Sequence, residues 1–151
     1  MQQVVYLAGF ISTEHPETFE WRNRVGFTLQ QVHGFQTLSP LRGKAELTRT
    51  STDGGISSTE HTPHDIILRD FGDIARSDLV LVNLNTYGST RPLVGTIFEL
   101  AWAWEHRKPV IAFCEADNYL MRKHPFVQES VAHYFEAEQE AVKYILHNYW
   151  R

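Results

Sequence analysis

VGTIFELAWAW, residues 94–104, is the stretch that decides how this chain folds. It follows an apolar run at residues 79–84 and a polar loop at residues 85–91. We predict a helix entered through Gly95, with Glu99 in its first turn and an apolar face behind that carboxylate. A strand, a loop and a glycine-led helix are the usual setting of a ligand site in an open α/β sheet. The helix dipole also favours a first-turn acid by roughly 0.3–1 kcal/mol, so Glu99 alone does not identify a site.

The composition is that of an ordinary globular protein. The chain has 151 residues, 42% hydrophobic and 21% charged, which predicts one domain over residues 1–151. The net charge of −4 gives no basic footprint, so we expect no nucleic-acid polymer as partner. No apolar run is long enough to cross a membrane, and the N-terminus lacks a signal pattern. With a single cysteine, Cys114, the chain is expected to be cytoplasmic, without disulfides and without membrane association.

Apolar strands alternate with helices along the chain. We expect strands at residues 4–9, 35–38, 79–84, 109–113 and 131–135. We expect helices from a cap at Ser12 or Thr13 to about residue 33, and then over 63–77, 95–106 and 136–147. A short helix is expected somewhere within residues 117–130. Residues 41–62 are a long polar excursion, and both a mobile loop and a lid over a site remain open.

Helical spacing predicts which side chains face the core. The expected core positions are Trp21, Val25, Leu29 and Val32 in the first helix, Ile67, Phe71 and Ile74 in the second, and Ala137, Ala141, Tyr144 and Ile145 in the last. Asp70 and Asp73 fall near the stripe of the second helix.

This pattern predicts a doubly wound, flavodoxin-like parallel sheet of five strands in the order 2-1-3-4-5, with helices on both faces. The ligand crevice of such a sheet lies between the first and third strands. Residues 6–10 would then face residues 83–95, which brings Tyr6 close to Glu99. We expect the phenol to donate a hydrogen bond to the carboxylate, although a plain core role for Tyr6 also fits.

Several segments resemble the nucleoside 2-deoxyribosyltransferase family, which also includes 2′-deoxynucleoside 5′-monophosphate N-hydrolases. The resemblance is carried by VYLAG at residues 5–9, Asp70, the Ser77-Asp78 pair, GTIFELA at 95–101 and KPVI at 108–111. It implies an enzyme of nucleoside salvage that cleaves an N-glycosidic bond. Glu99 would be the nucleophile and would form a covalent glycosyl-enzyme, which suits the oxocarbenium-like transition state.

The resemblance also implies roles for other residues. Asp70 would lie near the nucleobase and help to protonate it as it leaves. The strand order, and not the resemblance, gives Tyr6 its expected role of orienting Glu99. Asp78 matches the family pattern, with a structural role in capping a turn equally open. The expected substrate contacts are Gly9, Phe10, Asp78, Asn83, Ser89, Thr90, Gly95 and Thr96.

The sequence departs from the family at several positions. Six residues before the nucleophile, the transferases carry an aspartate and the hydrolases often a serine, but this chain has Leu93, so Ser89 or Thr90 would have to substitute. Residues 129–130 stand where the transferases use an asparagine from a neighbouring subunit. Arg22 and Arg24 lie deeper in the first helix than the phosphate-binding arginine of the hydrolases. We therefore favour a transferase acting on a 2′-deoxynucleoside and a free nucleobase. A nucleotide hydrolase and an inactive nucleotide-binding module are the alternatives.

No metal or cofactor is expected. His61 and His64 flank a helix start, but no further spaced ligand set accompanies them, so solvated or capping histidines are the better interpretation. Gly54 and Gly55 do not form a phosphate loop, because no Gly-Lys-Ser/Thr sequence follows them.

The helix at residues 95–106 also predicts assembly. Ile97, Ala101 and Trp104 lie on one side of it, and Phe98 and Trp102 lie on another. We expect a homo-oligomer through this helix, a dimer or larger. The alternative is that the excursion at residues 41–62 covers the second apolar face within one chain.

Overall fold

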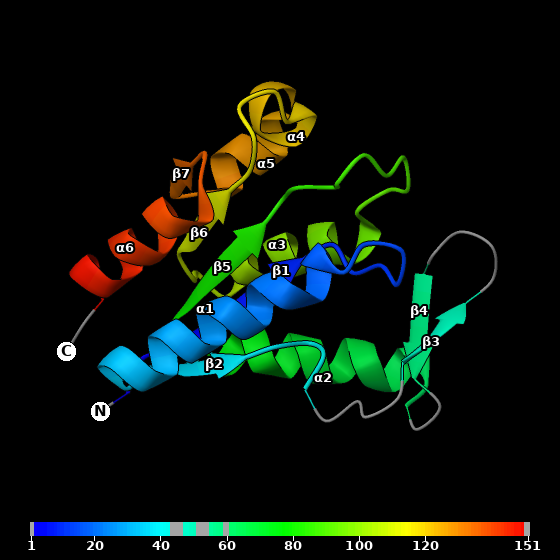
Figure 1. Cartoon of the computed structure of the whole chain (residues 1–151), viewed down its shortest axis with the longest axis horizontal. Helices are drawn as coiled ribbons and strands as arrows, with labels where there is room; N and C mark the ends of the chain where they lie inside the picture. Colours follow the sequence, from blue (N-terminus) through cyan, green and yellow to red (C-terminus); the bar gives the residue numbers. More distant parts are fainter. Residues whose placement is uncertain (1, 43–46, 51–54, 59–60, 150–151) are drawn as a thin grey trace.

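A computed structural model describes residues 2–42, 47–50, 55–58 and 61–149 of the chain. Its main sheet is parallel throughout and has the predicted order 2-1-3-4-5 (Figure 1). Across the sheet the strands are β2 (Gln36–Leu38), β1 (Val4–Gly9), β5 (Leu79–Asn83), β6 (Val110–Phe113) and β7 (His133–Phe135). The predicted fold class is therefore confirmed.

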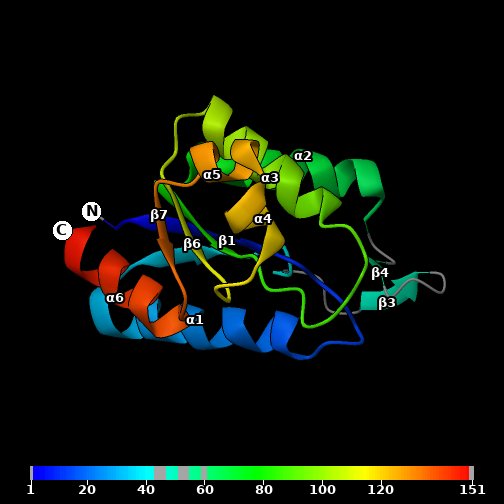
Figure 2. The same cartoon turned by 90° about the horizontal axis from the view of Figure 1, so that it is seen from above.

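Helices cover both faces of this sheet. One face carries α1 (Glu17–His33) and α6 (Glu138–Asn148), and the other carries α2 (Pro63–Arg76), α3 (Val94–Glu105) and α5 (Pro125–Ser130), as Figure 2 shows. The expected short helix within residues 117–130 is in fact a pair, α4 (Tyr119–Lys123) followed by α5. Among the described residues, no helix is both long and apolar enough to cross a membrane.

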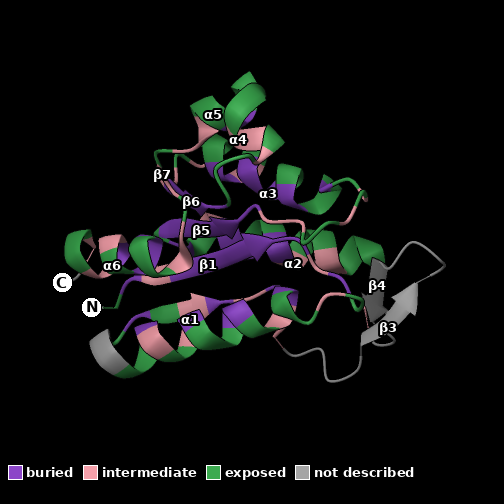
Figure 3. Cartoon of the chain, turned by 45° about the horizontal axis from the view of Figure 1, so that its top comes forward, coloured by how far each residue is buried: buried purple, intermediate pink, exposed green. Residues whose placement is uncertain are grey.

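The side chains of β1 separate into two cores. Val5 and Leu7 join the core beneath α1 and α6, whereas Tyr6 and Ala8 join the core beneath α2 and α3. This division follows from the alternation of side chains along a strand, since neighbouring residues point to opposite faces. The two central strands, β1 and β5, are buried almost throughout (Figure 3).

The predicted start of the first helix was wrong. The helix α1 begins at Glu17, directly after Pro16, and neither Ser12 nor Thr13 caps it. Residues 12–15 instead form a separate turn, in which His15 N donates to Ser12 O. Ser12 is bound to Thr18 in both directions, through its backbone N–H and its carbonyl oxygen. The polar residues that resembled a cap therefore stabilise the turn ahead of the helix.

The second helix begins where the sequence predicted. Thr62 and Asp65 form a reciprocal capping box, and Pro63 occupies the first turn of α2. The predicted core stripe was only partly right. Ile74 is fully buried, but Ile67 and Phe71 are 47% and 36% exposed.

The polar excursion has structure of its own. It contains an antiparallel hairpin, β3 (Leu47–Thr50) and β4 (Gly55–Ser58), which extends from the end of the molecule in Figure 1. Residues 43–46, 51–54 and 59–60 of the excursion lie outside the described residues, and so does Gly54. The choice between a loop and a lid therefore stays open.

Candidate active site

A cleft of about 570 Å³ opens where β1 ends and α3 begins. Its position next to the junction of β1 and β5 is the predicted crevice of the doubly wound sheet. The lining residues are Gly9, Phe10, Ile11, Pro40, Ile66, Ile67, Asp70, Arg91, Pro92, Leu93, Val94, Gly95, Thr96, Phe98, Glu99 and Trp102. Six residues predicted from the sequence are among them: Gly9, Phe10, Asp70, Gly95, Thr96 and Glu99.

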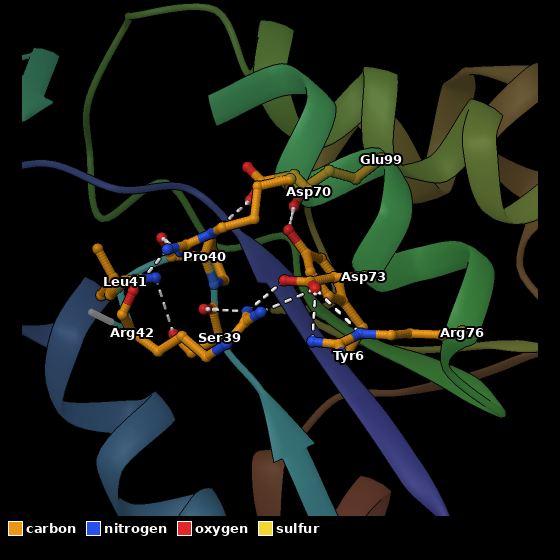
Figure 4. A network of polar contacts seen from close by, with 10 residues as sticks. Tyr6, Ser39, Pro40, Leu41, Arg42, Asp70, Asp73, Arg76 and Glu99 are labelled. Atoms are coloured by element: carbon orange, nitrogen blue, oxygen red, sulfur yellow. Dashed lines mark hydrogen bonds and ion pairs between the residues drawn. The ribbon is translucent and has the colours of Figure 1, made fainter. Parts of the chain in front are cut away.

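Glu99 is a buried carboxylate, 6% exposed, at the inner side of α3. The helix begins at Val94, so Glu99 lies in its second turn, and the expected first-turn position was wrong. Because the dipole effect fades beyond the first turn, it does not explain why an acid is buried here. The hydrogen bond from Tyr6 accounts for it better: the phenol of Tyr6 donates to Glu99 Oε2 across 93 residues of sequence (Figure 4).

Tyr6 lies beneath the cleft and is completely buried. Burial raises the pKa of its phenol well above 10, and the negative charges of Glu99 and Asp70 raise it further. At neutral pH Tyr6 is therefore a neutral donor. The expected hydrogen bond to Glu99 is present, and a phenol anchored in the sheet holds the carboxylate in one orientation.

Asp70 brings a second buried carboxyl group to the cleft from α2. Its neighbour Arg69 lies 4.0 Å away, measured from Nε to Asp70 Oδ1. The two terminal nitrogens of Arg69 donate to the carbonyl oxygens of Pro40 and Arg42, both at 2.7 Å. These bonds connect α2 to the segment after β2, and Pro40 of that segment lines the cleft opposite Asp70 (Figure 4).

A partly buried ion pair strengthens the same connection. Asp73, one turn beyond Asp70, binds Arg42 through both carboxylate oxygens and also accepts from Arg76. Asp73 is almost fully buried and does not line the cleft. It therefore serves to fix the wall of the cleft in place.

The end of β1 requires glycine at position 9. Gly9 has a φ of +151°, and a Cβ there would lie 2.7 Å from the backbone oxygen of Asn83. Any side chain would thus force β1 away from β5 at the floor of the cleft. Next to it, the ring of Phe10 lies 4.7 Å from the guanidinium carbon of Arg91.

Four of the predicted substrate contacts lie outside the cleft. Asp78 is at the opposite end of β5, where its Oδ2 accepts from Val4 N at 2.8 Å, a contact that supports a structural role. Asn83 is buried and uses its side chain on Asn85 N and the Tyr87 hydroxyl, which shapes the following loop. Ser89 Oγ accepts from Arg91 N, and Thr90 is exposed. Ser89 is therefore engaged in a hydrogen bond within the loop, and Thr90 faces solvent.

Sequence reasoning missed Arg91. This residue lines the cleft, and its Nη2 donates to Ile11 O, which ties the loop after β5 to the end of β1. Leu93, the departure from the family pattern, is buried and contributes an apolar wall. The sequence does place a basic residue, Arg91, directly before Pro92 and the helix, which could have marked it as a site residue. Only the fold, however, brings it next to Phe10 and Ile11.

The arrangement combines an oriented carboxylate, a second carboxyl group and a largely apolar wall. A carboxylate in such a setting can stabilise or trap a glycosyl cation, and a nearby carboxyl group can exchange a proton with a leaving group. Among the described residues, no cluster of three or more histidine, cysteine or acidic side chains could hold a metal ion. Burial raises the pKa of the Cys114 thiol to about 11, which makes it a poor nucleophile.

Solved structures resemble this chain over nearly its whole length. A conserved protein from Enterococcus faecalis V583 covers 97% of the chain, and 99% of that protein is covered, at 15% identity and a TM-score of 0.67. The 2-desoxiribosyltransferase from Leishmania mexicana is 19% identical, with 97% and 98% of the two chains covered and a TM-score of 0.64. The CMP N-glycosidase from Clostridium botulinum is 16% identical, with 95% and 98% covered and a TM-score of 0.57. At these identities the likeness establishes the fold.

Sequence comparison establishes more. No curated protein matches the chain in sequence. The profile of the family described as nucleoside 2-deoxyribosyltransferase matches residues 5–143, which include Tyr6, Asp70 and Glu99. Since this match spans most of the chain, the protein belongs to the nucleoside 2-deoxyribosyltransferase family.

Proposed function

We propose that this protein transfers a 2-deoxyribosyl group from a 2′-deoxynucleoside to another nucleobase through a covalent intermediate on Glu99. The observation that carries the proposal is the buried carboxylate of Glu99, held by the Tyr6 phenol inside the cleft. Burying a carboxylate is costly because the group gives up its hydration, and titratable groups buried in a cleft are typical of functional sites. A second carboxyl group, Asp70, shares the same cleft.

In the first step, one carboxylate oxygen of Glu99 bonds to C1′ of the sugar as the bond from C1′ to the base nitrogen breaks. The electron pair of that bond goes to the base, and Asp70 supplies the proton that the base takes up. In the second step, a nitrogen of the acceptor base attacks C1′ and gives up its proton to Asp70, while the bond from C1′ to the Glu99 oxygen breaks and its electron pair returns to the carboxylate. Tyr6 holds Glu99 at the angle that both steps need.

The apolar side of the cleft suits a nucleobase. Ile66, Ile67 and Phe98 line it together with Trp102, and such side chains pack on the flat face of an aromatic base. Ile66, Ile67 and Phe98 also offer an attacking water molecule no hydrogen-bond partner. This supports transfer to a base in preference to hydrolysis.

One observation favours a second candidate, the hydrolysis of a 2′-deoxynucleoside 5′-monophosphate. Arg91 contributes a cation to a cleft whose other charged lining residues, within the described part of the chain, are Asp70 and Glu99. A nucleoside offers Arg91 no anionic partner, whereas a nucleotide offers a phosphate, which guanidinium groups bind well.

A single assay separates these candidates. The protein is incubated with a 2′-deoxynucleoside, or with its 5′-monophosphate, each with and without a second free base, and the products are resolved by chromatography. A new deoxynucleoside that forms only with the acceptor base supports transfer. Free base and sugar phosphate from the nucleotide, abolished in Arg91→Met, support the second candidate. Binding of either compound without any product would show an inactive nucleotide-binding module and would contradict both.

Asp70 has its own test. Asp70→Ala should slow substrates with poor leaving bases more than substrates with activated ones, because only the former need a proton as the bond breaks. Rates for both types are measured side by side. An equal loss for both would mean that Asp70 is only structural.

A further inference from the structure

A buried arginine lies beneath the floor of the cleft. Arg22, in α1, is only 3% exposed. Its Nε donates to Leu7 O at 3.2 Å and its Nη2 to Gly9 O at 2.9 Å, while Nη1 donates to Thr18 O. Backbone carbonyl groups carry no net charge, so these bonds satisfy the donors without neutralising the cation.

Gly9 separates this cation from the cleft. A Cβ at Gly9 would lie 3.5 Å from Arg22 Nη2, and Gly9 itself lines the cleft. Arg22 is absent from the lining, so a substrate does not touch it. The helices α1 and α3 lie on opposite faces of the sheet (Figure 2). Arg22 reaches β1 at Gly9, and Glu99 reaches the same strand at Tyr6. The two buried charges therefore bind the same strand from opposite faces, Arg22 at its last residue and Glu99 three residues earlier.

Charge considerations connect these two residues. Burial lowers the pKa of Arg22 to about 10, so it remains a cation at neutral pH. Among its neighbours, Glu99 is the group that most favours the charged form. A buried cation is costly unless an opposite charge compensates it. The neutral phenol of Tyr6 does not do so, and Asp70 favours the charged form less than Glu99 does, so Glu99 is the main compensating charge.

We propose that Arg22 is a positioning residue that provides the buried countercharge of Glu99 and favours release of the sugar. This inference rests on the covalent step proposed above. When Glu99 bonds to C1′, its carboxylate becomes a neutral ester, and Arg22 loses its compensating charge. When the bond between C1′ and the Glu99 oxygen breaks, its electron pair returns to the carboxylate and the charge is compensated again. Arg22 therefore stabilises the free carboxylate relative to the ester.

The first test needs no catalysis. Melting temperatures are compared for Arg22→Met, Glu99→Gln and the double variant. Because each single change leaves one buried charge less compensated, the double variant should melt about 2–4 °C above the value expected from adding the two shifts. Arg24→Met is the matched control, since Arg24 is in the same helix but pairs with Glu138 on the surface. Its shift should simply add to that of Glu99→Gln.

Additive shifts for Arg22→Met and Glu99→Gln would overturn the proposal. If Arg22→Met is too unstable to purify, Arg22→Gln removes the same charge and retains an N–H donor for the carbonyl groups. The same comparison then applies.

The second test follows the reaction. Mass spectrometry measures the fraction of enzyme that carries a sugar adduct during turnover. Arg22→Met should raise this fraction and lower kcat and KM together, each by about tenfold, because loss of the sugar becomes slower than its attachment. Arg22→Lys retains the charge but loses the geometry of the guanidinium, and its adduct fraction should stay near that of the wild type.

A merely structural role would lower kcat equally in the Met and Lys variants without adduct accumulation, and this result would overturn the proposal. The two tests also separate the present inference from the proposed function. If the wild type forms no product but the melting temperatures show the coupling, the proposed function fails and the pairing of Arg22 with Glu99 stands. If product forms but the melting temperatures are additive, the proposed function stands and the pairing of Arg22 with Glu99 fails.

Discussion

The two helical layers of this protein differ in how many large apolar side chains they expose to solvent. We call α1 and α6 the closed layer, because their large apolar residues Trp21, Val25, Leu29 and Ile145 are buried against the sheet. We call α2, α3 and α5 the open layer, because a second set of apolar residues faces outward from it. That set is Ile67, Leu68, Phe71, Val94, Ile97, Phe98, Trp104 and Phe126.

The open layer also carries the buried carboxyl groups. Glu99, Asp70 and Asp73 all project inward from α2 and α3. The closed layer contributes a buried charge as well, Arg22, but it contacts backbone carbonyl groups and not the cleft. From this difference we expect the closed layer mainly to stabilise the sheet, and the open layer to supply the carboxyl groups of the cleft and a surface for assembly. Each prediction below tests one side of this contrast.

The largest effect is expected at the centre of the open layer. Glu99→Gln keeps the size of the side chain and should keep the fold, but it removes the proposed nucleophile. We expect turnover to fall by several orders of magnitude, as for other covalent nucleophiles. Product formation and circular dichroism are measured on the same samples. Near-normal exchange of bases by this variant would exclude a glycosyl-enzyme on Glu99.

The closed layer should respond in stability. Trp21 is fully buried and its ring packs edge-on against Phe113, with 5.4 Å between ring centroids. Trp21→Ala should reduce the free energy of unfolding by about 3–5 kcal/mol, because it leaves a large cavity. Urea denaturation measures this loss. A loss below about 1 kcal/mol would mean that the closed layer is not the main stabilising side.

The sequence predicted the sheet better than it predicted the site. Runs of apolar residues between helical segments were enough to fix the strand order, and the strand order alone placed Tyr6 beside Glu99. The first-turn assignment of Glu99 is wrong for either helix start, because Glu99 is the fifth residue from Gly95 and the sixth from Val94, beyond a turn of about 3.6 residues. The position of Arg91 depends on Phe10 and Ile11, about 80 residues away, so no local pattern reveals it.

The open layer misled the sequence analysis in an informative way. Ile67 and Phe71 fit a core stripe by their spacing, yet both are substantially exposed, while Asp70 and Asp73 are buried. A periodic pattern identifies an apolar face but not the surface that covers it. On α2 this pattern marks a surface that one chain leaves partly open.

We expect that a second copy of the chain covers the open layer, so the next prediction concerns assembly. Trp104 is 64% exposed and lines an apolar groove with Ile97 and Phe126. Light scattering at micromolar concentration should show at least a dimer. Trp104→Glu should weaken it by about 100-fold, because it places a charge in an apolar interface. A wild-type monomer with full activity would contradict this assignment of the surface.

A smaller effect is expected where the sheet meets the open layer. Tyr6→Phe removes the hydrogen bond to Glu99 but fills the same space. Turnover should fall by about 10- to 100-fold, which corresponds to one charge-assisted hydrogen bond, with the melting temperature nearly unchanged. Steady-state kinetics and thermal unfolding measure the two quantities. A large loss of stability with unaltered turnover would assign Tyr6 to the core alone.

The smallest effect is expected at Phe27, the most exposed aromatic side chain among the described residues of the closed layer. Phe27 of α1 is 70% exposed and stands apart from the apolar set of the open layer. Single exposed apolar residues are common on monomer surfaces and need no partner, whereas contiguous ones indicate an interface. Phe27→Ser should therefore change the free energy of unfolding by no more than about 0.5 kcal/mol and leave the oligomeric state unaltered. The comparison with Trp104→Glu matters because both changes remove an exposed aromatic ring from a helix. If Phe27→Ser disrupts assembly as strongly, the interface lies on α1 and the distinction between the two layers is lost.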